Sequence, residues 1–96
     1  MPQIKINETK VKKMTYNWFV INFEINKALH SIFKSGFDTG KIISSLNIVA
    51  GFKIEPSNTL IILDEIQACP EAITSLKYFQ ENSPEYNIFA AGSLLG

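Results

Sequence analysis

The fold is decided by the stretch Thr59-Leu60-Ile61-Ile62-Leu63-Asp64-Glu65-Ile66-Gln67. Its apolar residues follow one another without polar alternation, which is typical of a strand buried on both faces of a parallel sheet. Two carboxylates, Asp64 and Glu65, come directly after that strand. Because ligands bind at the carboxyl ends of strands in open α/β sheets, the stretch predicts a central strand with a candidate site at its end.

Two more strands are predicted, one before and one after this stretch. Residues 17–24 and 86–91 are rich in aromatic and β-branched side chains, which favour strands. Within the first of them, Trp18 and Phe19 are predicted to lie in the core. Helical patterns fill the intervening segments, so the order of elements is β-α-α-β-α-β. Because helices connect the strands, the strands are expected to pair in parallel.

The helix boundaries are marked by capping residues. Asn26 is predicted to cap the first helix, which ends at Gly36, and Asp38 to cap the second, which ends at Gly51. Pro70 suits the first turn of the third helix, because its missing N–H is not needed there.

Three strands are few for a parallel sheet, whose two faces are normally both covered by helices. No helix is predicted after the strand at 86–91. We therefore expect a fragment of a wider sheet, or a chain that needs a partner to complete it. The folded part is predicted to span residues 17–96, preceded by a loose arm at 1–16.

The composition excludes several classes of protein. The 96 residues suit one small domain or a piece of a larger one, and 46% are hydrophobic against 19% charged, which favours a folded chain. The formal net charge is zero, and no interleaving of basic and aromatic residues indicates nucleic-acid binding. No apolar run is long enough to span a membrane, and the single cysteine, Cys69, cannot form an internal disulfide. These features favour a reduced, cytoplasmic protein.

Polar residues follow each predicted strand: Glu24 the first, Asp64 and Glu65 the second, and Ser93 the third. If the strands are parallel neighbours, these residues converge on one edge. Paired carboxylates there are what a nucleotide-hydrolysing site places beside phosphate-bound Mg²⁺. In this interpretation Asp64 holds the metal, Glu65 activates the attacking water, and Ser93 hydrogen-bonds a terminal phosphate or the water.

A plainer interpretation stays open for the same residues. Asp64 can simply begin a turn and Glu65 a loop, with no chemistry at either position. Ser93 follows a glycine in a combination that is ordinary in turns. Glu24 is interpreted as structural.

A phosphate cradle would be the required complement: a glycine-rich loop after a strand, with Lys on the phosphates and Ser or Thr on the metal. The nearest match is Gly36-Phe37-Asp38-Thr39-Gly40-Lys41-Ile42. It is one residue too short between its glycines, has Ile42 where a hydroxyl is needed, and follows a predicted helix. We interpret it as a turn between helices. The sequence also contains no arginine, so it supplies no arginine finger.

Four segments together resemble prokaryotic AAA-type ATPases that carry an uncharacterised C-terminal domain: Asn22-Phe23-Glu24, Leu63-Asp64-Glu65-Ile66-Gln67-Ala68-Cys69-Pro70, Ser75-Leu76-Lys77-Tyr78-Phe79 and Ala91-Gly92-Ser93-Leu94-Leu95-Gly96. The resemblance covers residues 17–96. It implies an α/β fold, a partial three-layer α-β-α P-loop NTPase core with a short parallel sheet. It places Asp64 and Glu65 at the Walker B positions and Ser93 at the sensor-1 position. It also implies ATP and Mg²⁺ as the ligands of an intact family member.

The sequence departs from the family pattern upstream of residue 17, where the first strand, the Walker A loop and the next helix would lie. We therefore expect a truncated ATPase core that does not bind ATP tightly and does not hydrolyse it alone. The expected partner is the missing part of the ATPase, or a second chain, at the open edge of the sheet. The alternative is a non-enzymatic remnant or interaction module that pairs through the same edge. A phospho-acceptor domain ranks last, because the second acid pair that it needs is absent.

Overall fold

The computed structural model describes residues 16–93. The arm predicted at 1–16 therefore lies, except for Tyr16, outside the described residues. The elements are β1 (Asn17–Asn22), η1 (Lys27–Leu29), α2 (His30–Lys34), α3 (Thr39–Ala50), β2 (Thr59–Asp64), η2 (Ile66–Ala68), α4 (Pro70–Asn82) and β3 (Asn87–Ala90).

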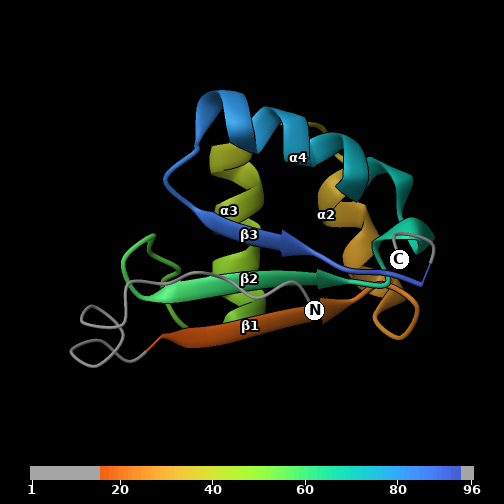
Figure 1. Cartoon of the computed structure of the whole chain (residues 1–96), viewed down its shortest axis with the longest axis horizontal. Helices are drawn as coiled ribbons and strands as arrows, with labels where there is room; N and C mark the ends of the chain where they lie inside the picture. Colours follow the sequence, from red (N-terminus) through yellow and green to blue (C-terminus); the bar gives the residue numbers. More distant parts are fainter. Residues whose placement is uncertain (1–15, 94–96) are drawn as a thin grey trace.

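The strands form one sheet in the order β1-β2-β3, and both pairs are parallel (Figure 1). In the register, Asn22 lies opposite Asp64 at one end, and Leu63 lies opposite Ala90. β2 is therefore the central strand, and its residues 59–63 are all buried. The predicted α/β class, strand order along the chain and parallel pairing are confirmed.

Helices α2, α3 and α4 pack against one another and against one face of the sheet (Figure 1). The strand side chains in this core alternate along the chain, as the pleat requires: Ile21 from β1, Ile61 and Leu63 from β2, with Ile88 and Ala90 of β3 packed against them. The helices add buried residues at helical spacing, namely Phe33, Ile42, Ile43, Leu46, Ala72 and Phe79. Within residues 16–93 the chain thus supplies the sheet and one helical layer of the expected three-layer core.

The opposite face of the sheet explains one wrong prediction. Trp18 was expected in the core, but its side chain is 59% exposed. Trp18 lies opposite Leu60 in the register, and neither residue belongs to the core between the sheet and the helices. Phe19, one position further along, faces the helices and packs against that core, as predicted.

The capping predictions gave mixed results. Asp38 caps α3 as expected, since its Oδ1 accepts a hydrogen bond from the backbone N–H of Lys41 at 3.2 Å. Gly51 ends that helix in the left-handed conformation at φ 78°. Asn26 occupies the predicted cap position, at the start of η1, but its side chain makes no capping hydrogen bond. The nearby Asn22 holds the turn that follows β1, because its Oδ1 accepts from the N–H groups of Glu24 and Ile25 at 2.9 and 3.2 Å.

Candidate functional site

The central strand carries Asp64 to the carboxyl edge of the sheet. Asp64 is the last residue of β2 and is half-buried, whereas the five residues before it are buried. Its Oδ1 accepts a hydrogen bond from the backbone N–H of Glu65 at 3.0 Å. One carboxylate oxygen is therefore engaged in holding the turn, and Asp64 is fixed on a strand that is paired on both sides.

Glu65 occupies an uncommon backbone conformation. With φ 50° and ψ 46° it is in the left-handed region, and it is the one residue other than glycine with a positive φ in the described range 16–93. Such a conformation costs of order 1 kcal/mol or more in a non-glycine residue and persists where the surroundings impose it. Here the next residue, Ile66, donates its N–H to the carbonyl of Ala91 at 3.1 Å, which ties the turn to the end of β3.

Ser93 is joined to the acid pair through a residue that the sequence interpretation did not single out. The Nε2 of Gln67 donates to Glu65 Oε2 at 2.6 Å and lies 3.5 Å from Ser93 Oγ. Gln67 therefore links two predicted site residues, Glu65 and Ser93, while the third, Asp64, is bonded to the backbone of Glu65. Gln67 belonged to the quoted stretch, but nothing in its spacing showed that its side chain folds back.

Glu24 lies beyond the same end of β1 and is exposed. Among the described residues its carboxylate has no hydrogen-bond partner, and only its backbone N–H is engaged, by Asn22. The predicted convergence of strand ends is thus correct, but Glu24 is not tied to the acid site.

The side chains at this edge match Mg²⁺ better than they match a triphosphate. Carboxylate and hydroxyl oxygens are donors that Mg²⁺ accepts, and this ion keeps several waters, so a single carboxylate can suffice. Within residues 16–93 there is no cluster of three or more acidic, His or Cys residues that would enclose a metal. The ion pair found in this range, Lys53 with Glu55 at 3.9 Å, involves neither acid of the site.

The segment 36–42 joins two helices, as interpreted from the sequence: residues 36–38 form the turn, and residues 39–42 are the start of α3. It connects α2 to α3, and Asp38 is occupied as the cap of α3. Its backbone therefore offers no loop between a strand and a helix in which phosphates could be cradled.

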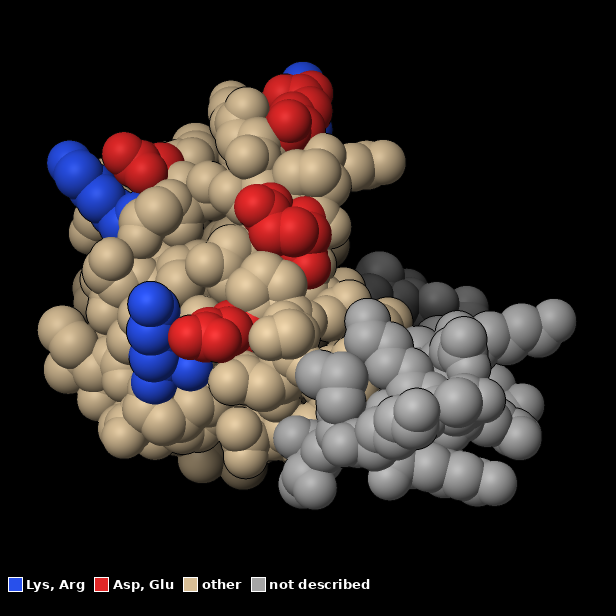
Figure 2. Space-filling view, turned by 90° about the vertical axis from the view of Figure 1, so that its left-hand side faces the viewer, with Lys and Arg blue, Asp and Glu red and all other residues tan. Residues whose placement is uncertain are grey.

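The charged side chains on the opposite side of the molecule do not indicate a surface that binds a polyanion. Figure 2 shows the side from which the strands begin, where Lys side chains lie next to acidic ones in small groups and form no basic field. This agrees with the zero net charge of the sequence.

His30 and Cys69 have structural explanations. The Nε2 of His30 lies 2.7 Å from the carbonyl oxygen of Phe23, beside an edge-to-face contact of the two rings. Cys69 is fully buried and unpaired. Burial raises the pKa of its thiol, and the neighbouring Glu71 carboxylate raises it further, against a lowering by the Ala72 backbone hydrogen bond. A protonated, enclosed thiol is a poor nucleophile and metal ligand.

A parallel sheet with an acid pair after its central strand and a hydroxyl after the next strand is consistent with a partial P-loop NTPase core. Residues 6–96 match the family model described as AAA domain, and the chain belongs to this family. Proteins of this family bind ATP and Mg²⁺ in general. Comparison with curated proteins found no match, and comparison with solved structures found none. In the described part of the chain, every helix is too short or too polar to cross a membrane.

Proposed function

We propose that this chain contributes the acidic part of a Mg²⁺–ATP site, and that the phosphate-binding loop comes from outside these 96 residues. The observation that carries the proposal is the meeting of Asp64, Glu65 and Ser93 where β2 and β3 end. Membership of the AAA domain family supports ATP as the nucleotide. The sequence supplies no Gly-rich loop ending in Lys and a hydroxyl residue.

Each residue has a distinct part in this proposal. Asp64 keeps the carboxylate oxygen that Glu65 does not engage, and this oxygen would hold Mg²⁺, directly or through water. Glu65 would orient the attacking water and accept its proton, a contribution of about a hundred- to ten-thousand-fold in rate. The hydroxyl of Ser93 would donate a hydrogen bond to an oxygen of the terminal phosphate. Bound Mg²⁺–ATP supplies the electrophilic phosphorus and the charge neutralisation.

The chain as it stands is expected to show no ATP hydrolysis above background. Without backbone N–H groups around the phosphates, the two carboxylates repel the triphosphate. The measurement is phosphate release from ATP and Mg²⁺ by the purified chain, with Glu65→Gln as the matched variant. Hydrolysis by the wild-type chain that Glu65→Gln abolishes would show that no outside loop is needed and would contradict the proposal.

We further propose that the outer edge of β3 is where the rest of the site attaches. No strand in the described range pairs with this edge. Ala91 directs its N–H to the carbonyl of Leu63 at 2.9 Å and its C=O to Ile66, so by the alternation of a parallel ladder Ala90 and Ile88 point their backbone groups outward. A further parallel strand can pair with those groups.

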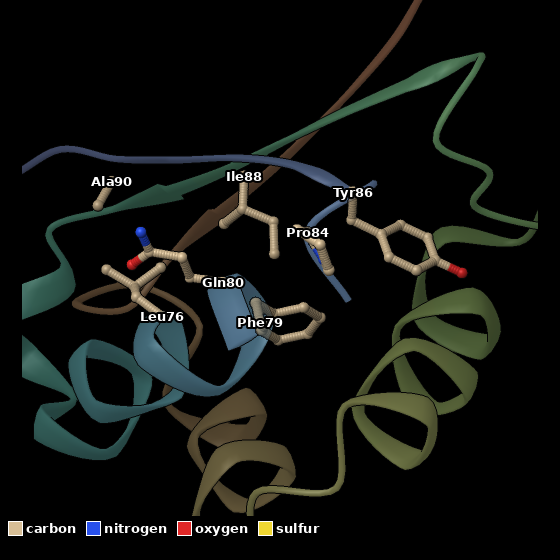
Figure 3. A pocket seen from close by; sticks show the side chains of 7 residues that line it. All are labelled: Leu76, Phe79, Gln80, Pro84, Tyr86, Ile88 and Ala90. Atoms are coloured by element: carbon tan, nitrogen blue, oxygen red, sulfur yellow. The ribbon is translucent and has the colours of Figure 1, made fainter. Parts of the chain in front are cut away.

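A hollow beside this edge supports the same proposal. It measures about 310 Å³ and lies between α4 and β3, where the side chains of Leu76, Phe79 and Ile88 converge (Figure 3). Its wall is mainly apolar, so an added strand would place an apolar side chain there. The occupant we propose is an apolar strand of the polypeptide that carries the phosphate-binding loop; a second copy of this chain would use the same edge as an interaction module.

The edge can be blocked without touching the ladder to β2. Ala90→Pro removes an outward-pointing N–H, the position at which proline is tolerated on an edge strand. If a second copy of this chain occupies the edge, light scattering of the wild-type chain will show mass that rises with concentration, and Ala90→Pro will remain monomeric with an unchanged melting temperature. A wild-type chain that stays monomeric at all concentrations would count against self-pairing through β3.

We also propose a cytoplasmic location. The support is the unpaired, buried Cys69, which suits a reducing compartment.

A further inference from the structure

Gln67 is held in a constrained position between the two strand ends. It belongs to the short turn η2, whose first residue is tied to β3 by the bond from Ile66 N–H to the Ala91 carbonyl. From there its side chain reaches back to Glu65 Oε2 at 2.6 Å and to Ser93 Oγ at 3.5 Å. The side chain thus bridges the carboxylate of Glu65, just after β2, and the hydroxyl of Ser93, which follows β3.

The orientation of the amide is dictated by the carboxylate. Gln67 Oε1 is buried and has no hydrogen-bond partner in the described part of the chain, which is an unfavourable state for an acceptor. Turning the amide over would place this oxygen against Glu65 Oε2 and bring two acceptors together. The side chain therefore leaves its own oxygen unpaired in order to donate to Glu65.

Gly92 provides the room for this arrangement. A Cβ built on Gly92 would overlap Gln67 Oε1 and lie 3.3 Å from Gln67 Cδ. Any larger residue at 92 would push the amide away from Glu65. A glycine between β3 and Ser93 is thus needed by the Gln67 side chain rather than by the backbone, because φ at Gly92 is not positive.

We infer that Gln67 is a positioning residue, whose amide fixes the carboxylate of Glu65 relative to Ser93. The inference rests on the proposed function, since the direction of Glu65 matters there for the attacking water. It adds a residue that touches neither metal nor phosphate and acts through Glu65.

The first test observes the Gln67 side-chain amide by NMR. In the wild-type chain its Nε2 protons are expected to exchange with water at least ~10-fold more slowly than those of Gln80, which is exposed on α4. Glu65→Ala and Gly92→Ala should both remove this difference, and Glu81→Ala, on the exposed side of α4, should leave it. A Gln67 amide that exchanges as fast as that of Gln80 in the wild-type chain would overturn the inference.

The second test exchanges donor and acceptor. Gln67→Glu places two carboxylates in contact and should lower the melting temperature by about 4–8 °C, the shift that corresponds to roughly 1 kcal/mol in a domain of this size. The double variant Glu65→Gln with Gln67→Glu restores one donor and one acceptor, and should recover at least half of that loss. A residue that merely fills space would show no recovery, and a double variant no more stable than Gln67→Glu alone would contradict the inference.

These tests need neither metal nor nucleotide, so their outcome is separate from that of the proposed function. Slow exchange at Gln67 without metal binding at Asp64 would leave the positioning contact intact and refute the Mg²⁺ site. Metal binding at Asp64 with a freely exchanging Gln67 amide would support the Mg²⁺ site and refute the positioning contact. If Gln67→Glu does not fold, the wild-type exchange rate still decides.

Discussion

Leu46→Ala is expected to cost about 2–5 kcal/mol of unfolding free energy and to lower the melting temperature by ~8 °C or more. Leu46 is 1% exposed and lies on α3 in the core cluster beneath the sheet. Truncating it removes apolar burial and leaves a cavity that the surrounding side chains fill only in part. The measurement is thermal and denaturant unfolding followed by circular dichroism.

The same helix offers a matched control. Ile48 is 84% exposed, two positions further along α3. Ile48→Ala removes no buried surface, and alanine is the better helix former, so its free energy of unfolding should stay within about 0.5 kcal/mol of the wild-type value. Equal losses for the two variants would show that α3 does not pack on the face assigned to it.

Mn²⁺, used as a paramagnetic substitute for Mg²⁺, is expected to broaden the NMR signals of Asp64, Glu65 and Ser93 before those of other residues. Asp64→Asn should abolish this pattern, with a fall of at least ~10-fold in apparent affinity, or about 1.4 kcal/mol. Asparagine retains a side-chain oxygen for the N–H of Glu65, so the turn can persist while the charge is lost. The variant therefore isolates the charge from the geometry.

Glu81→Gln is the control for this metal experiment. Glu81 is exposed on α4, away from the strand ends, and its loss should leave the broadening unchanged. Broadening that is lost in Glu81→Gln, or that is unaltered in Asp64→Asn, would place the cation elsewhere and refute the proposed site.

The sequence predicted the structure best where the pattern of burial or a local capping bond determines the secondary structure. The apolar run at 60–63 is typical of a strand buried on both faces, and β2 was placed correctly together with its parallel neighbours. The turn at Asp38 and the end of α3 at Gly51 were predictable because each depends on a local capping bond. That Asp64 and Ser93 follow the carboxyl ends of neighbouring parallel strands was predictable from the alternation of strands and helices.

The predictions that were wrong or missed concern features that tertiary contacts determine. Asn26 stands at the start of the first helix as predicted, but its side chain makes no capping bond, whereas the side chain of Asn22 holds the turn after β1. The alternation along β1 was visible, but not which set of side chains the helices would cover, so Trp18 was misplaced. Gln67 was overlooked because its direction depends on the left-handed turn at Glu65 and on the space above Gly92.

The central position of β2 gives the two neighbouring acids unequal freedom. Asp64 ends a strand that is hydrogen-bonded on both sides, so it can shift only if the sheet itself opens, an event that requires much of the global unfolding energy. Glu65 begins a turn, and its carboxylate is held by the bond from Gln67 Nε2, so loss of that bond can release it while the sheet stays intact. The backbone of one acid is thus anchored as firmly as the core, and the carboxylate of the other depends on a single side-chain contact.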